Sequence, residues 1–217
     1  MFGEIAPTYD LCNSLMSLRR HRAWRALAVQ TLALAPGDRV ADVCCGTGDF
    51  FGPLRKAVGP TGTVIGIDFC LPMLALAGKK DVQAGRALGD ACALPLRSGS
   101  VKAVSVGWGI RNVPDIDAAH REIHRVLKSG GVFVSLDMAI PRGRVLRAMS
   151  RFATLGLLPR LGALFGKREA YTYLPKSTQT FMTREQLQES MERAGFRDVT
   201  FRDLFFGNVC LHRGVKP

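Results

Sequence analysis

The sequence lacks the cysteine spacing of a metal-binding protein. Its six cysteines stand at positions 12, 44, 45, 70, 92 and 210, and none forms a Cys-x-x-Cys pair. Two adjacent cysteines do not easily hold one ion in tetrahedral geometry without distant partners, so we interpret Cys44 and Cys45 as small loop residues and predict no metal. Cysteines without a pattern are typical of a reducing compartment, and we expect a cytoplasmic protein.

Long apolar runs are also missing, and acidic side chains are scarce. Each mainly apolar stretch is broken by Arg, Gly or Pro before it reaches membrane-spanning length, and the opening Met-Phe-Gly-Glu-Ile shows no basic region followed by an apolar run. We therefore expect neither a transmembrane segment nor a secretory signal. The 30 basic and 18 acidic side chains give a net charge of +12, which favours anionic partners such as nucleic acid or acidic lipid without choosing between them.

Two nucleotide-binding patterns are incomplete. The dinucleotide fingerprint G-x-G-x-x-G would need glycines at 46, 48 and 51 of the stretch RVADVCCGTGDFFG, but position 51 is Phe. A Gly-Lys-Ser/Thr sequence, which ends a phosphate-binding loop, occurs nowhere in the chain. These absences count against a nicotinamide-dependent dehydrogenase and a nucleoside triphosphatase.

Short apolar runs alternate with helical patterns over the first two thirds of the chain. Strands are predicted at 39–43, 62–69, 85–91, 101–110 and 130–138. Helices are predicted at 20–35, from Phe50, at 71–78 and at 115–128. Near-continuous apolar strands between helices indicate an α/β fold with a buried, mostly parallel sheet.

After Pro141 the character of the sequence changes. Residues 144–168 are basic and apolar, a helix capped by Thr183 and Gln186 is predicted at 183–195, and two closing strands are expected to pair antiparallel. We predict a single domain over 1–217. Its parts are an N-terminal helical cap (1–36), a cofactor-binding core (37–140), a lid or substrate segment (141–182) and a closing helix with strands (183–217).

The basic segment has two interpretations. Arg144, Arg147 and Arg151 would share one helical face, and Val145, Met149 and Phe152 would share another. Basic amphipathic helices of this kind lie on anionic membranes. A solvated arginine face over a packed apolar face is the plain alternative.

Three acids stand near the carboxyl ends of three successive predicted strands. These are Asp42, Asp68 and Asp90, and the turn Gly46-Thr47-Gly48 lies after the first. Because the carboxyl ends of parallel strands open on one crevice, we expect the acids and the turn to meet there. Asp68 would accept the two hydroxyls of a ribose, and Asp90 an exocyclic amine. A cationic adenosyl cofactor without a pyrophosphate, S-adenosyl-L-methionine, meets these requirements; a Gly-x-Gly turn alone would be ordinary loop structure.

Four further segments resemble those of a known family. IAPTYDLCNSLMSLRRHRAW (5–24) is similar to the N-terminal box of the class I methyltransferases that methylate quinone rings in menaquinone and ubiquinone biosynthesis. WGIRNVPD (108–115), HRVLKSGGVFVSLD (124–137) and EAYTYLPKSTQTF (169–181) are similar to that family's later signatures. The resemblance covers nearly the whole chain. It implies a Rossmann-like class I methyltransferase fold, with a mostly parallel seven-stranded sheet, a C-terminal antiparallel strand and a helical lid insertion.

The resemblance also implies a reaction and a set of site residues. The reaction is S-adenosyl-L-methionine-dependent C-methylation of a demethylmenaquinol or a related prenylated quinol. Arg111 is the predicted catalytic residue, because a cation beside the developing phenolate favours attack by the ring. The predicted cofactor-binding residues are Asp42, Gly46, Thr47, Gly48, Asp68, Phe69, Asp90, Ala91 and Gly107. The predicted substrate-binding residues are His21, Trp24, Arg111, Asn112 and Tyr171.

Some positions depart from the family pattern and keep alternatives open. Cys44 stands in place of a loop glycine, Gly107 in place of a small hydroxyl residue, Ser129 in place of a proline and Asp137 in place of a glutamate. One alternative is a methyltransferase-like scaffold that binds without turnover. Another is a methyltransferase of RNA or another small molecule, although the Asn/Asp-Pro-Pro-aromatic turn and the Pro-Cys nucleophile of base methyltransferases are both absent. We expect a prenylated quinol and an anionic membrane surface as partners, do not expect nucleic acid, and leave a homo-oligomer open.

Overall fold

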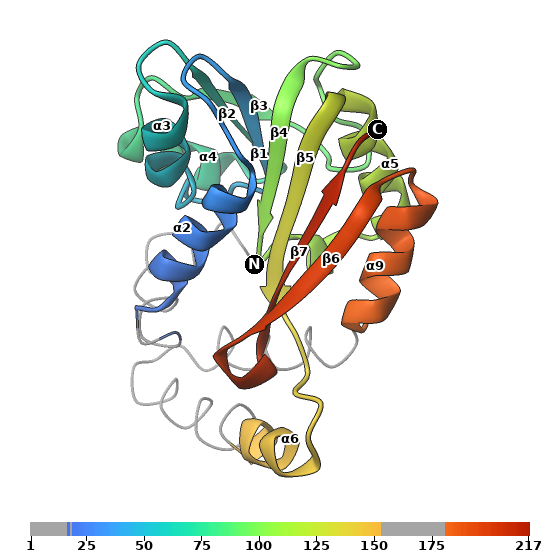
Figure 1. Ribbon diagram of the computed structural model, residues 1–217. Coiled ribbons are helices and arrows are strands. Elements are labelled where there is room, and N and C mark those ends of the chain that lie inside the picture. Colours follow the sequence, from blue (N-terminus) through green and yellow to red (C-terminus); the bar gives the residue numbers. More distant parts are fainter. Residues whose placement is uncertain (1–16, 18, 153–180) are drawn as a thin grey trace.

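The computed structural model describes residue 17, residues 19–152 and residues 181–217, and its centre is a seven-stranded sheet (Figure 1). The strand order is β3-β2-β1-β4-β5-β7-β6. The strands are β1 (Arg39–Val43), β2 (Thr63–Asp68), β3 (Gly85–Leu88), β4 (Val101–Gly107), β5 (Leu127–Met138), β6 (Arg197–Leu204) and β7 (Val209–Val215). Strands β1 to β5 pair in parallel, and β7 runs antiparallel to its neighbours β5 and β6. The predicted sheet, with its antiparallel closing strand, is confirmed.

Helices cover both faces of the sheet. On one face lie α2 (His21–Thr31), α3 (Phe51–Val58) and α4 (Leu71–Lys80), and on the other α5 (Ile116–Val126) and α9 (Arg184–Arg193). Each face has its own apolar cluster, built around Phe51 and Leu54 on the first and around Phe133 and Phe196 on the second. Helix α6 (Arg144–Arg151) lies apart from both layers, beyond the carboxyl end of β5 (Figure 1).

Polar side chains cap the first turns of α5 and α9. The Asp115 carboxylate accepts a hydrogen bond of 2.8 Å from the backbone N–H of Ala118 and starts α5. At α9 the Thr183 hydroxyl accepts from the Gln186 backbone, and the Gln186 side chain accepts from the Thr183 backbone. This reciprocal pair confirms the predicted capping box.

Two strands are shorter than their apolar patterns. Strand β3 ends at Leu88, so Asp90 lies two residues past it, in an isolated bridge with Ala93. Strand β4 ends at Gly107, because Trp108 adopts φ +56° and turns the chain out of the sheet. Ile110–Asn112 then form a 3-10 turn. Both loops begin at the carboxyl edge of the sheet, where a site can form.

The division of the chain into cap, core, lid and closing parts stays a prediction. The lid range of 141–182 includes α6, and most of its remainder lies outside the described residues. No helix in the described part of the chain is long and apolar enough to cross a membrane.

Candidate functional site

The turn after β1 contains three residues in the left-handed region of the backbone. They are Cys44 (φ +54°), Gly46 (φ +54°) and Gly48 (φ +77°). Gly109 makes room for the side chain of Cys44, because a Cβ on Gly109 would lie 2.3 Å from the Cβ of Cys44. Cys44 thus adopts the conformation of the glycine that it replaces, at a cost of roughly 1–2 kcal/mol for a residue with a Cβ.

Asp68 joins this turn to the end of β2. Its Oδ2 accepts from the backbone N–H of Gly46 at 2.8 Å, and its Oδ1 accepts from the N–H of Cys70 at 2.9 Å. Burial raises the pKa of Asp68, and the backbone N–H groups of Gly46, Cys70 and Phe69 offset part of that rise. These donors hold the carboxylate in one orientation.

A cavity of about 410 Å³ opens where the predicted cofactor residues converge. Seven of the predicted site residues line it: Gly46, Asp68, Phe69, Asp90, Ala91, Gly107 and Asn112. Its volume lies in the range of roughly 300–1,000 Å³ that small-molecule sites occupy. Gly107 needs to lack a side chain, because a Cβ there would lie 2.4 Å from Cε2 of the buried Phe50.

Other predicted residues lie outside the lining of this cavity as the described residues define it. They are Asp42, Thr47, Gly48, His21, Trp24 and Arg111. Trp24 packs against Trp108, whose ring centroid is 6.3 Å away and which does line the cavity. Tyr171 lies outside the described residues.

Asp42 is buried in the sheet behind the turn. Its partner is Ser105, which lies opposite it in the β1–β4 register and donates a hydrogen bond of 2.7 Å to Oδ1. The other oxygen, Oδ2, has no hydrogen-bond partner among the described residues. Burial raises the pKa of Asp42 to about 7, even though Ser105 and Arg25 favour the ionised form.

Arg25 connects three segments around the turn. From α2, its Nη2 lies 2.9 Å from Oδ2 of Asp49, and its guanidinium stands 4.6 Å from the ring centroid of Trp108. Lys80 of α4 also pairs with Asp49 and donates to the hydroxyl of Thr47 at 2.9 Å. Burial opposes the ionisation of Asp49, but Arg25 and Lys80 together lower its pKa.

Arg25, which contacts Asp49 of the turn and Trp108 of the cavity wall, was not among the residues predicted from the sequence. The available signal was its position three and four residues before Ala28 and Val29, on the buried side of α2.

Arg111, in the 3-10 turn after β4, is held by Asp137, which lies near the end of the neighbouring strand β5. One guanidinium nitrogen, Nη1, pairs with Oδ1 of Asp137, and the backbone N–H of Arg111 donates to Oδ2 at 3.4 Å. The Arg111 side chain is only 6% exposed, and its Nε–H has no partner among the described residues. A buried cation with a free donor can stabilise a negative charge that develops next to it.

His120 and His124 stand four residues apart on α5, a spacing that can bind a metal. Here the two rings have separate neighbours. Nδ1 of His120 lies 2.7 Å from the Ser190 hydroxyl, and His124 packs edge-on against Phe196. Within the described residues, no group of three or more His, Cys, Asp or Glu side chains is placed to hold a metal ion.

The architecture resembles that of solved methyltransferases. A SAM-dependent methyltransferase from Thermotoga maritima superposes with a TM-score of 0.71 and 20% identity, over 100% of this chain and 98% of that one. Phosphoethanolamine N-methyltransferase 2 of Haemonchus contortus, in complex with phosphomonomethylethanolamine and S-adenosylhomocysteine, superposes with a TM-score of 0.66 and 17% identity, over 90% of this chain and 52% of that one. The fold is that of a Rossmann-like class I methyltransferase, as predicted.

The family follows from the sequence itself. A profile of the ubiE/COQ5 methyltransferase family matches residues 1–216, and the chain belongs to this family. A demethylmenaquinone methyltransferase of Staphylococcus aureus (strain JH9) is 38% identical over 220 residues, which cover 100% of this chain and 91% of the relative. The chain is therefore a methyltransferase, and the prediction of S-adenosyl-L-methionine as its cofactor is confirmed.

The geometry fits that cofactor. Two carboxylates, Asp68 and Asp90, face a cavity whose other walls include the apolar Phe69 and Ala91. A Cβ built on Gly46 would meet nothing within 4 Å, so the backbone of the turn is open to a ligand. Acids suit a cationic sulfonium and amino group, and apolar walls suit a flat base.

Proposed function

We propose that this chain methylates a ring carbon of a demethylmenaquinol, with S-adenosyl-L-methionine as the methyl donor. The observation that carries the choice of acceptor is the 38% identity along the whole chain with the demethylmenaquinone methyltransferase of S. aureus. When bound, the cofactor supplies a methyl group on a positively charged sulfur. A carbon–carbon bond forms, the sulfur–methyl bond breaks and the ring carbon loses its proton, so the products are the methylated quinol, S-adenosylhomocysteine and H⁺.

The cofactor is assigned to the residues around the first cavity. Asp68, whose carboxylate is oriented by the backbone N–H groups of Gly46 and Cys70, would accept hydrogen bonds from the ribose hydroxyls. Asp90 would accept from the exocyclic amine, with Phe69 and Ala91 on the faces of the base. Asp42, which accepts a hydrogen bond from Ser105 within the sheet, would support the turn from behind. Thr47, whose hydroxyl accepts from Lys80, and Gly48 would shape the turn that faces the cofactor.

Arg111 is assigned to the acceptor. Its pairing with Asp137 fixes the guanidinium and leaves the buried Nε–H available. A phenolate oxygen beside that donor would be stabilised as the ring attacks, an effect typically worth about 100- to 1,000-fold in rate for one donor. His21, Trp24, Asn112 and Tyr171 stay predicted substrate residues; of these, Asn112 borders the first cavity.

A radiolabelled methyl-transfer assay tests this function. The acceptor is a short-chain demethylmenaquinol analogue that is kept reduced. The proteins are wild type, Arg111→Ala and the control Arg121→Ala, which removes an exposed arginine of α5. We expect label in the quinol with wild type and Arg121→Ala, and a kcat lower by about 100-fold with Arg111→Ala. No label with wild type contradicts the proposed acceptor, and full activity of Arg111→Ala contradicts the role of this residue.

We also propose that α6 binds an anionic membrane surface, where a prenylated quinol resides. Val145 and Met149 of α6 are 72% and 63% exposed, and Phe152, directly after the helix, is 74% exposed. Four arginines and no acid lie between residues 138 and 152. Exposed apolar side chains beside basic ones are typical of helices that lie in the lipid headgroup region.

Co-sedimentation with vesicles tests this membrane contact. Wild type should bind vesicles that contain about 30% phosphatidylglycerol and not pure phosphatidylcholine, with an affinity that falls as salt is raised. A Val145→Asp, Met149→Asp double variant should lose most of this binding. Equal binding by wild type and the double variant would contradict the assignment.

A further inference from the structure

A second cavity, of about 530 Å³, lies beside the first, between the end of β5, α6, the start of α9 and the turn between β6 and β7. Asp137 of β5 and Arg151 of α6 both belong to its lining. Among the described residues, its lining includes part of the predicted lid or substrate segment (141–182) but none of the individually predicted cofactor-binding or substrate-binding residues.

The Arg111–Asp137 pair links the two cavities. Asp137 lines the second cavity, and its carboxylate holds the guanidinium of Arg111. Asn112, the next residue after Arg111, lines the first cavity. A molecule in the second cavity that reaches Asp137 therefore comes close to the cation assigned to the reacting oxygen.

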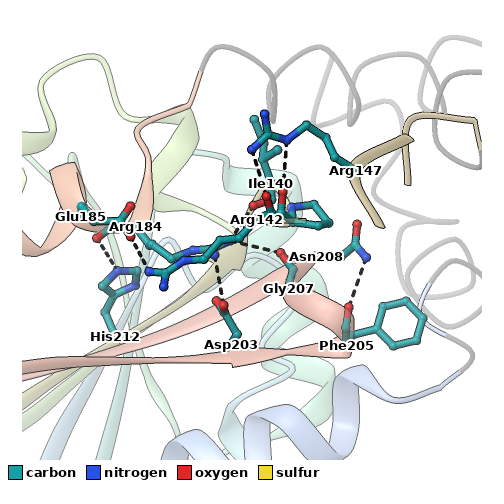
Figure 2. Close-up of polar contacts among 11 residues, drawn as sticks. Ile140, Arg142, Arg147, Arg184, Glu185, Asp203, Phe205, Gly207, Asn208 and His212 are labelled. Carbon is teal, nitrogen blue, oxygen red and sulfur yellow. Dashed lines mark hydrogen bonds and ion pairs between the residues drawn. The ribbon is translucent and has the colours of Figure 1, made fainter. Parts of the chain in front are cut away.

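Buried hydrogen bonds hold the walls of the second cavity in place. The guanidinium of Arg184, 4% exposed, donates to the carbonyl of Ile140 at 2.7 Å, to that of Gly207 at 3.2 Å and to Oδ2 of Asp203 at 3.0 Å (Figure 2). These bonds tie the segment after β5 to the turn between β6 and β7. His212, whose Nε2 lies 2.9 Å from the Arg184 carbonyl, fixes the start of α9 to β7. The hollow is thus framed by a defined polar network.

The lining is apolar in the middle and basic at the side of α6. Ile140, Phe181, Met182 and Leu187 supply apolar surface, and Arg147 and Arg151 supply positive charge. Helix α6 turns Arg147, Ser150 and Arg151 toward the cavity and leaves Val145 and Met149 exposed. Such a lining suits a molecule with an apolar body and a polar or anionic oxygen.

We infer that this second cavity is the acceptor pocket, and that a prenylated aromatic diol binds in it with one ring oxygen at the Arg111–Asp137 pair. Its apolar tail lies along Ile140, Phe181 and Leu187 and leaves the protein beneath α6. This inference rests on the proposed function for the identity of the acceptor. It adds the location of the pocket and a positioning role for Asp137, which orients Arg111.

A tryptophan scan across α6 tests the inference. Ser150→Trp fills the cavity from its outer wall, and Ala148→Trp, at an exposed position of the same helix that does not border the cavity, is the matched control. The acceptor is 2-geranyl-1,4-naphthoquinol, and calorimetry measures the affinity for S-adenosyl-L-methionine. We expect Ser150→Trp to lower kcat/KM for the quinol by about tenfold or more, mainly through KM, with cofactor affinity within about twofold of wild type. Ala148→Trp should match wild type.

A kcat/KM of folded Ser150→Trp that stays within about twofold of wild type overturns the inference. If Ser150→Trp does not fold, Ile140→Trp fills the cavity from the segment after β5 and gives the same readout, since the Ile140 side chain is partly exposed.

Binding separates this inference from the proposed function. If wild type does not methylate the quinol, the proposed function fails, and calorimetry with the oxidised 2-geranyl-1,4-naphthoquinone then decides the pocket. Heat of binding with wild type and Ala148→Trp but not with Ser150→Trp supports the pocket for this ligand class. No heat with any protein, or equal heat with all three, overturns it.

Discussion

Replacement of Asp42 by Asn should make the stability of the protein less sensitive to pH. The pKa of Asp42 rises from 3.8 to about 7 on folding, because burial penalises the carboxylate and Oδ2 has no partner among the described residues. Between these two pH values the folded state keeps the proton that the unfolded state has lost. The free energy of unfolding of wild type therefore decreases through this group as pH rises from about 4 to about 7.

The magnitude follows from the same two values. A difference of about 3 between the folded and unfolded pKa corresponds to a destabilisation of the folded state by roughly 4 kcal/mol. This destabilisation is fully present above pH 7 and absent below pH 4. Asn resembles the protonated acid in shape and can still accept from Ser105. Asp42→Asn should thus be close to wild type near pH 4 and more stable by up to roughly 4 kcal/mol near pH 8.

Urea unfolding of wild type and Asp42→Asn at pH 4.5, 6 and 8 measures this difference. Ser105→Ala is the control, because loss of its hydrogen bond should raise the pKa of Asp42 further and steepen the decline of stability. A stability difference between Asp42→Asn and wild type that stays constant across the three pH values would refute the assignment.

Three other substitutions probe the packing around the site. Gly66→Ala should lower the free energy of unfolding by about 1–3 kcal/mol in a urea titration, because its Cβ would lie 2.3 Å from Cζ of Phe51. Gly85→Ala, whose Cβ meets its nearest atom at 3.7 Å, should be close to neutral. Equal effects of the two substitutions would contradict tight packing at Gly66. Arg25→Met should weaken cofactor binding in calorimetry by about tenfold through loss of the Asp49 pair, with the exposed Arg22→Met as control; unchanged affinity would remove Arg25 from the site. Gly107→Ser should lower cofactor affinity despite restoring the family's hydroxyl, because Phe50 occupies the space of a Cβ; a gain in affinity would show that Phe50 can move.

Much of the architecture could be predicted from local pattern. The apolar runs at 39–43 and 62–69 match β1 and β2 within a residue, and Thr183 with Gln186 marked the start of α9. These features depend on neighbours in sequence. The ends of β3 and β4 depend instead on single backbone conformations, such as φ +56° at Trp108. An aromatic residue rarely adopts this conformation, so the sequence does not predict it.

The first cavity was predictable because its acids follow successive strands. Asp68 and Asp90 reach the same cavity even though Asp90 lies beyond the end of β3. The partners of the buried charges were not predictable in this way. Ser105 faces Asp42 only through the β1–β4 register, and Asp137 meets Arg111 only through the pairing of β4 with β5. Such contacts join residues 63 and 26 positions apart in the chain.

Calorimetric titration of S-adenosyl-L-methionine into wild type, Asp68→Ala and Glu189→Ala tests whether Asp68 holds the cofactor. Glu189 is an exposed acid on α9 and serves as the control for loss of one negative charge. Saturable binding by wild type and Glu189→Ala, with an affinity at least about tenfold weaker in Asp68→Ala, is the predicted result. Absence of binding by wild type, or the same affinity in all three proteins, would contradict a cofactor site built on Asp68 at the carboxyl edge of the sheet.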